Sequence, residues 1–433
     1  MKRPRHRRTA GTTPKPVPRW LAALGPGFVT GASDDDPSGI GTYAQAGAQF
    51  GTGLLWTMLL TYPLMVAIQE ISARLGRVTG RGLALNLRHI CPRWLLYVLL
   101  ALLAMTNTVN IGADVSAMAA ASQLLFGGPA LSYAIGFAAI SIVLEIFVPY
   151  HRYAKILMVL TGSLAAYVAT AAVVEVPWAD ALRRSFVPEL RSDASYFMMI
   201  VAVFGTTISP YLFFWQASEE VEEERNDAAA KPLLRAPWQG PTQLRRIRTD
   251  TLIGMGASNL IAWFIMLTTS ATLHRSGTRD IESAAQAAAA LEPIAGKFAA
   301  WLFAAGIVGT GLLALPVLAG SVAYALGEAM HFRIGLELKP KAAPKFYAAI
   351  TIAMVLGAVM NALPLSPMKA LVYTAVLNGV VAVPIMIMVM RLAMDHEVMG
   401  RFVTPPVLAA LGWAATAVML VATIVMFATL GRS

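Results

Sequence analysis

The stretch GASDDDPSGIG, residues 31–41, decides how this chain folds. It places Asp34, Asp35 and Asp36 in the middle of an otherwise apolar segment. A charged group at the centre of a bilayer costs at least about 2.5 kcal/mol, so helix packing alone does not account for three of them. Pro37 follows directly, and proline cannot donate the helical hydrogen bond. The stretch therefore predicts a helix that unwinds at mid-membrane, where only a cavity or surrounding protein tolerates free backbone groups.

The composition is that of an integral membrane protein. Of the 433 residues, 57% are hydrophobic and 13% are charged, about half the charged fraction of a typical soluble protein. The single cysteine, Cys91, excludes an internal disulfide and a cysteine-based metal site.

Eleven apolar segments are long enough to cross a bilayer, which takes roughly 20 residues. They lie near residues 20–50, 51–73, 94–124, 131–149, 153–174, 196–218, 250–273, 298–328, 344–362, 368–390 and 405–430. We expect an all-α membrane protein with a basic, disordered tail (1–19), a first five-span repeat (20–174), an extracellular loop (175–195), a second five-span repeat (196–390) and an eleventh span (405–430).

The basic residues predict the orientation of these spans. Most of the 34 Lys and Arg residues lie in 1–19, 74–93, 151–155, 219–248, 331–345 and 391–401. By the positive-inside rule these segments are cytoplasmic, which places the N-terminus inside and the C-terminus outside the cell inner (plasma) membrane. The net charge of +10 then needs no nucleic-acid partner. A cleaved signal peptide is not favoured, because the apolar part after Arg19 shows no convincing small-residue cleavage site.

A second break is expected in the sixth span, at GTTISP, residues 205–210. Spans one and six are corresponding members of two five-span halves. Interrupted helices at matching positions indicate the binding site of an inverted-repeat transporter. A purely structural proline kink is the alternative for the sixth span. Carboxylates, freed carbonyls and hydroxyls together suit hard cations such as magnesium, calcium or manganese.

Three quoted stretches carry a resemblance to a known family. LGPGFVTGASDDDPSGIGTYAQAGAQFG (24–51), GTTISPYLFFWQ (205–216) and RTDTLIGMGASNLIAWF (248–264) resemble the natural-resistance-associated macrophage protein (Nramp) family of divalent-metal transporters. The resemblance implies a LeuT-type fold, with the metal held between helices one and six as substrate rather than cofactor. It also implies that the lipid bilayer and the divalent ion are the partners, with no oligomer required.

The resemblance also implies a ligand set, with departures. Asp36 matches the metal-binding aspartate of the family, with Asp35 as a neighbouring carboxylate, while Gly39 stands where the family has a ligating asparagine. Ser209 replaces a ligating methionine, and Thr206 keeps a carbonyl role. Losing the thioether removes a reason to prefer iron or manganese over harder ions, and glycine is expected to widen the site for a hydrated ion. The closest resemblance is to Nramp-related proteins associated with magnesium.

Further residues are expected along the pathway or beside the ligands: Asp34, Thr207, Tyr211, Asp114, Asn110 and Asn378. Thr106 and Val109 replace the acidic pair of the family's proton path, and Tyr211 replaces a histidine. We therefore expect potential-driven uptake without proton coupling. Asp114 and Glu145 are exceptions that either carry protons or are simply buried, hydrogen-bonded acids. The alternatives are a proton-coupled manganese or iron transporter, and a LeuT-fold transporter of an amino acid or organic cation.

Enzyme classes fit poorly. An intramembrane aspartyl protease needs a second aspartate from another helix, and no other span offers a comparable motif. A metalloenzyme would use histidines within the spans, whereas the histidines here are confined to the tail, loops and span ends, at residues 6, 89, 151, 274, 331 and 396. The acidic run at residues 219–224 is expected to be a solvated loop balanced by Arg245, Arg246 and Arg248.

Overall fold

A computed structural model describes residues 25–148, 157, 160–362 and 366–430, which are helical with no strand among them. The predicted tail, residues 1–19, lies outside the described residues. The first half contains α1 (Pro26–Asp34), α2 (Pro37–Phe50), η1 (Gly51–Leu54), α3 (Trp56–Thr79), α4 (Leu83–Ile90), α5 (Arg93–Phe126), α6 (Ala130–Phe147), η2 (Gly162–Leu164), α8 (Ala165–Val173) and α9 (Trp178–Phe186).

The second half begins with α10 (Ala194–Thr207) and α11 (Pro210–Asn226). It continues with η3 (Pro237–Gln239), α12 (Gly240–Thr269), the π-helical η4 (Ser270–His274), α13 (Ala284–Ala289), α14 (Glu292–Ala295), η5 (Gly296–Phe298), α15 (Ala299–Met330), α16 (Pro344–Val359), η6 (Met360–Ala362), α17 (Pro367–Ala393), α18 (His396–Met399), η7 (Gly400–Phe402) and α19 (Pro406–Leu430). Each of the eleven expected spans corresponds to a helix or a broken helix, and the fifth is described only in part.

Length and hydropathy alone identify fewer spans than the sequence pattern. Within the described residues, seven helices are long and apolar enough to cross a membrane, with the broken sixth span counted as one. A bend of 109° separates Pro37–Leu54 from Trp56–Thr79, which match the end of the first and the second expected span. Gly162–Val173 and Pro344–Val359 are apolar but shorter. The remaining expected spans are interrupted by polar breaks or formed by short helices, so the division into eleven spans stays a prediction.

Both predicted breaks are present. The first separates α1 from α2 at Asp35 and Asp36, and Pro37 is the first residue of α2. The second separates α10 from α11 at Ile208 and Ser209, and Pro210 is the first residue of α11. Proline suits the first helical turn because its missing N–H would have no intrahelical partner there. The prolines therefore restart each helix rather than merely kinking it.

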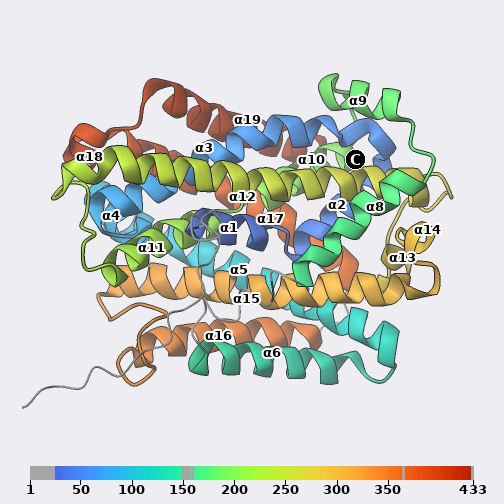
Figure 1. The fold of residues 1–433 in the computed structure, drawn as a ribbon, viewed down its shortest axis with the longest axis horizontal. Helices are drawn as coiled ribbons and strands as arrows, with labels where there is room; N and C mark the ends of the chain where they lie inside the picture. Colours follow the sequence, from blue (N-terminus) through green and yellow to red (C-terminus); the bar gives the residue numbers. More distant parts are fainter. Residues whose placement is uncertain (1–24, 149–156, 158–159, 363–365, 431–433) are drawn as a thin grey trace, which may run out of the picture.

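The broken helices lie inside the bundle. Figure 1 shows α1, α2 and α11 between one layer containing α3 and α12 and another containing α15, α16 and α6. The most apolar stretch of Ala194–Asn226 is 89% buried, against 22% for Ala130–Phe147. The helices α9, α13 and α14 gather at one end of the molecule, and α4 and α18 at the other (Figure 1). The interrupted segments are thus shielded from lipid, as unpaired backbone requires.

Small residues allow the broken helices to approach their neighbours closely. A Cβ on Gly31 of α1 would lie 2.3 Å from the carbonyl carbon of Gly254 in α12. A Cβ on Gly205 of α10 would lie 2.1 Å from the carbonyl oxygen of Ala375 in α17. Both crossings therefore depend on backbone-to-backbone contact, as is common between membrane helices.

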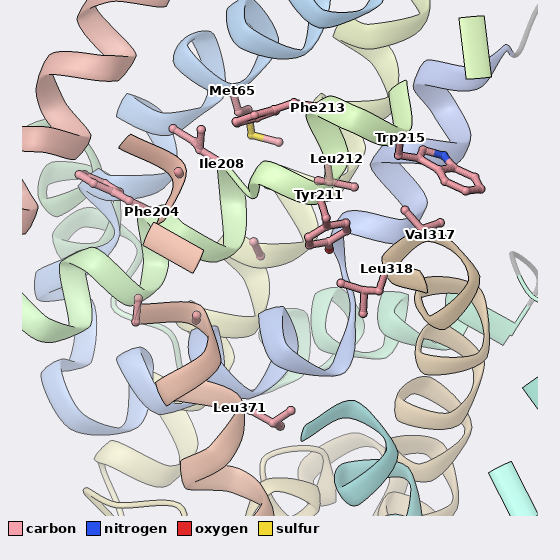
Figure 2. Close-up of a cluster of buried hydrophobic side chains, with 14 of the residues drawn as sticks. Met65, Phe204, Ile208, Tyr211, Leu212, Phe213, Trp215, Val317, Leu318 and Leu371 are labelled. Atoms are coloured by element: carbon pink, nitrogen blue, oxygen red, sulfur yellow. The ribbon is translucent and has the colours of Figure 1, made fainter. Parts of the chain in front are cut away.

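A core of large side chains surrounds the second break. Figure 2 shows Phe204 and Ile208, at the end of α10 and in the break, and Tyr211, Leu212, Phe213 and Trp215 in the first turns of α11. These side chains lie among Met65 of α3, Val317 and Leu318 of α15 and Leu371 of α17 (Figure 2). Each of them is at most 2% exposed. The break is thereby held within a close-packed interior.

The prediction of a solvated loop at residues 219–224 is wrong. This segment forms the last turns of α11, which continues to Asn226. Glu220 is fully buried and pairs with Arg246 of α12. Arg246 also lies 3.1 Å from Glu223. The high charge of the segment suggested a loop, but ion pairing to a neighbouring helix lets it remain helical.

Candidate functional site

Asp36 is the centre of the polar groups at the first break. It is the N-cap of α2, and its Oδ1 accepts a hydrogen bond from the Gly39 amide at 2.6 Å. Its Oδ2 accepts from Asn110 Nδ2 at 3.1 Å and from the Tyr211 hydroxyl at 3.3 Å. The fold thus brings together four of the sequence-predicted residues, from α2, α5 and α11.

Asp34 and Asp35 share a single partner. The Ser258 hydroxyl of α12 lies 2.7 Å from Asp34 Oδ2 and 3.0 Å from Asp35 Oδ1. One hydroxyl has one proton, so it can donate to only one of these carboxylates at a time. Ser258 was not among the predicted site residues, although it lies within one of the quoted motifs. The only available signal was a polar residue in an apolar span.

Asp114 contacts the start of α2 from the side of α5. Its Oδ1 accepts a hydrogen bond from the Ser38 amide at 3.2 Å. The Ser38 hydroxyl lies 3.1 Å from the Leu371 carbonyl oxygen and 3.1 Å from Thr374 Oγ1, both in α17. The positive end of α2 is therefore met by two carboxylates, since Asp36 accepts the next amide.

Hydroxyls at the second break bond to their own helix. The Ser209 hydroxyl lies 2.7 Å from the Gly205 carbonyl oxygen and 2.9 Å from that of Thr206. The Thr207 hydroxyl donates to the Val203 carbonyl oxygen. The Ser209 hydroxyl thus lies against two carbonyls that the break would otherwise leave free. Thr207 is turned back along α10, away from the hydrogen bonds of Asp36.

The two breaks face each other at Gly39 and Thr206. A Cβ on Gly39 would lie 3.3 Å from Thr206 Oγ1 and 3.1 Å from the Asp34 carbonyl oxygen. The extra room expected at Gly39 is therefore filled in this arrangement, because the neighbouring break closes over it. Asn378 of α17 is 1% exposed and has no hydrogen bond joining it to Asp36 within the described part of the chain.

All of these residues are shut off from solvent. Asp34, Asp35 and Asp36 are 0%, 4% and 1% exposed. Several buried oxygens nearby have no hydrogen-bond partner among the described residues: Asp34 Oδ1, Asn110 Oδ1, Asp114 Oδ2 and Asn378 Oδ1. Buried acceptors are normally paired, so a concentration of unpaired ones is unusual. No group of three or more His, Cys, Asp or Glu in the described ranges could hold a metal ion. An ion here would need carbonyl, amide or hydroxyl oxygens as well.

One end of the site is closed by hydrogen bonds from α1 to α12 and α11. The Asp250 carboxylate of α12 accepts hydrogen bonds from the amides of Gly25, Gly27 and Phe28 at 3.0, 2.7 and 3.2 Å. The Thr30 hydroxyl of α1 also bonds Gln216 of α11. Asp250 was not among the residues predicted from the sequence.

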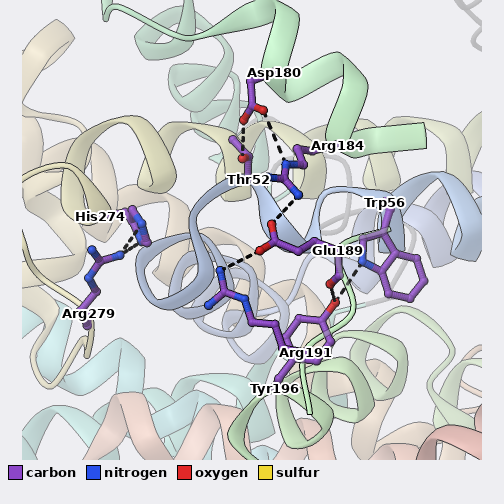
Figure 3. Close-up of polar contacts among 9 residues, drawn as sticks. All are labelled: Thr52, Trp56, Asp180, Arg184, Glu189, Arg191, Tyr196, His274 and Arg279. Carbon is purple, nitrogen blue, oxygen red and sulfur yellow. Dashed lines mark hydrogen bonds and ion pairs between the residues drawn. The ribbon is translucent and has the colours of Figure 1, made fainter. Parts of the chain in front are cut away.

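The other end is closed by a network of charged and aromatic side chains, shown in Figure 3. Asp180 of α9 accepts from the Thr52 hydroxyl at 2.9 Å and lies 3.5 Å from Arg184, which also pairs with Glu189. Arg191, 3.4 Å from Glu189, lies over the Phe50 ring. Phe50 ends α2 and makes an edge contact with Tyr196 in the first turn of α10, with ring centroids 5.4 Å apart. This network joins the C-terminal end of α2 to the N-terminal end of α10.

Two broken spans that enclose a buried, oxygen-rich site define the class of LeuT-type membrane transporters. The family described as Natural resistance-associated macrophage protein-like matches residues 27–429. The chain therefore belongs to the Nramp family and is a multi-pass membrane transporter, not an enzyme.

Individual proteins resemble this chain in sequence or in fold. The divalent metal cation transporter MntH of Aeromonas hydrophila is 28% identical over 413 residues, which is 93% of this chain and 94% of that protein. A manganese transporter of Eremococcus coleocola superposes with a TM-score of 0.72 at 16% identity, covering 98% of this chain and 89% of that one. Mhp1, a nucleobase-cation-symport-1 family transporter, shares the fold more distantly, with a TM-score of 0.57 at 14% identity over 94% of this chain and 93% of that one.

Proposed function

We propose that this protein carries divalent metal cations, magnesium or manganese, into the cytoplasm by alternating access. The observation that carries the proposal is the set of unpaired, buried oxygens around Asp36. A divalent cation would offset both the desolvation of these acceptors and the repulsion among the neighbouring aspartates. An anionic or apolar cargo would do neither. The MntH relative and the manganese transporter of similar fold support the same class of cargo.

The proposed ligands are oxygens from the two breaks. Asp36 and Asp35 supply carboxylates, the Thr206 carbonyl and the Ser209 hydroxyl supply neutral oxygens, and Gly39 keeps the α2 amide close to Asp36. An all-oxygen set favours hard ions over those that prefer sulfur. Magnesium keeps several of its waters when bound, so the breaks would have to separate to admit it.

Uptake is proposed to be driven by the membrane potential without proton coupling. The Thr106 hydroxyl lies 3.0 Å from the Leu102 carbonyl oxygen of its own helix, and Tyr211 donates to Asp36. Neither side chain offers a proton site that titrates near neutral pH. With the N-terminus inside, a divalent cation that enters the cytoplasm at a membrane potential of about −100 mV gains roughly 4.6 kcal/mol. This free energy can drive uptake without the co-transport of a proton.

A proton-coupled manganese transporter is the second candidate. One observation favours it: Asp114 is completely buried, has an unpaired Oδ2 and contacts the start of α2. In that case Asp114 would take up a proton when the ion binds at Asp36.

Uptake into proteoliposomes tests both candidates. Magnesium and manganese influx would be measured with a pH-sensitive dye inside, for the wild type, Asp36→Asn and the control Glu292→Gln. Glu292 is an exposed carboxylate of α14, so its substitution removes one charge away from the breaks. Influx of both ions without acidification, lost only in Asp36→Asn, is expected. Manganese influx with acidification, abolished by Asp114→Asn, would select the second candidate, and no metal influx would refute both.

A further inference from the structure

A basic cavity opens at the end of the molecule where α3, α11 and α15 finish. Its volume is ≈ 420 Å³, and its wall includes Arg81, Arg225, His331 and Arg333. Arg81 follows α3, Arg225 is in the last turn of α11, and His331 caps α15 with a φ of 58°. Basic residues from the end of α11 and from the segments that follow α3 and α15 therefore line one space.

The arginines of the basic cavity are not held in ion pairs with carboxylates. In the described ranges, the ion pairs involve other basic residues, and none joins Arg81, Arg225 or Arg333 to an acid. The stretches outside those ranges contain no Asp or Glu side chain. Arg81 Nη1 lies 2.8 Å from His89 Nε2 instead. Arg225 attracts the carboxylates of Glu224 and Glu328 at longer range, but no carboxylate in the described part of the chain occupies the hydrogen-bonding positions of the three guanidinium groups.

The one acid in the wall, Glu328, accepts a hydrogen bond from the start of α4. Its Oε2 accepts a hydrogen bond from the Leu85 amide in the first turn of α4 at 3.1 Å. A Cβ on Gly82, the N-cap of α4, would lie 1.9 Å from Glu328 Oε1. The carboxylate therefore sits against the positive end of α4, where a negative charge is stabilised.

The geometry points to a binding site for a phosphate-bearing anion in the basic cavity. Guanidinium groups form paired, charge-assisted hydrogen bonds with phosphate oxygens. The rest of the wall is largely apolar, from Leu85, Phe332, Ile334 and Leu338. Basic pockets between spans on the cytoplasmic side bind anionic lipid headgroups, and a soluble phosphate has the same chemistry. This site does not depend on the metal site proposed above.

A bound anion would add a second polar connection between α11 and the turn after α15. The first connection is made by Glu222 of α11. Its Oε1 accepts a hydrogen bond from the Glu337 amide at 2.8 Å, and its Oε2 accepts one from the Leu336 amide at 3.2 Å. A phosphate group bridging Arg225 and Arg333 would connect the same two segments. It would therefore stabilise the arrangement in which the breaks are buried.

Binding to the purified full-length protein tests this site. Inorganic pyrophosphate would be titrated by calorimetry in metal-free buffer, and lipid binding would be compared between phosphatidylglycerol and phosphatidylcholine vesicles. The test variant is Arg225→Gln with Arg333→Gln. The control is Lys339→Gln with Lys341→Gln, which removes the same charge from the same end, at positions outside the cavity wall. Unfolding temperatures without ligand establish that both variants are folded.

The wild type and the lysine control are expected to bind pyrophosphate, phosphatidylglycerol or both. The arginine variant should bind the same probe about a hundredfold more weakly, because each of the two guanidinium groups removed contributes about tenfold to the dissociation constant. Binding of the lipid alone identifies a headgroup, and binding of pyrophosphate alone identifies a soluble phosphate. The proposal is overturned if the wild type binds neither probe, or if the lysine control loses as much affinity as the arginine variant. Should the double variant not fold, Arg333→Gln alone gives the same comparison against Lys339→Gln.

Discussion

Replacing Asp250 by alanine should release the end of α1 that closes the site. Asp250 accepts three amide hydrogen bonds from this end of α1. Losing a capping acid typically costs about 1–2 kcal/mol. Opening at this end would require α1 to leave Asp250 and lose these hydrogen bonds, so their removal is expected to favour the open state by up to that amount. A difference of about 2 kcal/mol corresponds to a roughly thirtyfold change in the ratio of open to closed protein.

Thiol labelling measures this ratio directly. The buried native thiol would be removed by Cys91→Ala, and Ser33→Cys would place a reporter on the buried face of α1. A membrane-impermeant maleimide added from the side predicted to be cytoplasmic should label the reporter about fivefold to thirtyfold faster when Asp250 is alanine. Asp395→Ala is the matched control, because Asp395 also caps a helix, accepting the Glu397 amide at 2.7 Å, but does not contact α1. Equal labelling with and without Asp250 would refute the role given to these hydrogen bonds.

Three further substitutions give distinct outcomes. Gly31→Val should lower the free energy of unfolding by about 1–3 kcal/mol because its side chain would overlap α12. Gly136→Ala is the control, because a Cβ there meets open space. Thermal unfolding in detergent compares the two variants. Tyr211→His should make manganese uptake depend on pH between about 5 and 8, since it places a titratable ring beside Asp36; uptake by Tyr211→His that is flat across that range would contradict this. Ser258→Ala should weaken metal binding about fivefold, because Asp34 and Asp35 lose their shared donor, as the half-saturating manganese concentration would report.

Local chemistry could be predicted from the sequence. The aspartates with Pro37, and the later Pro210, mark both breaks because proline and mid-membrane charge act within a few residues of chain. Asp36, Asn110 and Tyr211 were all predicted from the sequence and lie within hydrogen-bond distance of one another through Asp36, whereas their roles at a metal site stay a prediction.

Pairings between distant segments could not be predicted in the same way. Ser258 reaches Asp34 across 224 positions, and Asp250 reaches Gly25 across 225. No local pattern specifies such a pairing, which depends on how α1 crosses α12. Thr207 is a different case, since a hydroxyl that bonds back to its own helix looks the same in sequence as one that faces a site.

The crossing of α1 and α12 also limits how this protein can change. Gly31 and Gly254 meet through their backbones, and both already have the smallest side chain. A larger residue at one position therefore cannot be compensated by a smaller one at the other. Random mutagenesis with selection for transport should recover neither position altered, even in pairs, while the loosely packed Gly136 varies freely. The crossing that brings the acidic break into the interior therefore leaves glycine as the one residue expected to be tolerated at these two positions.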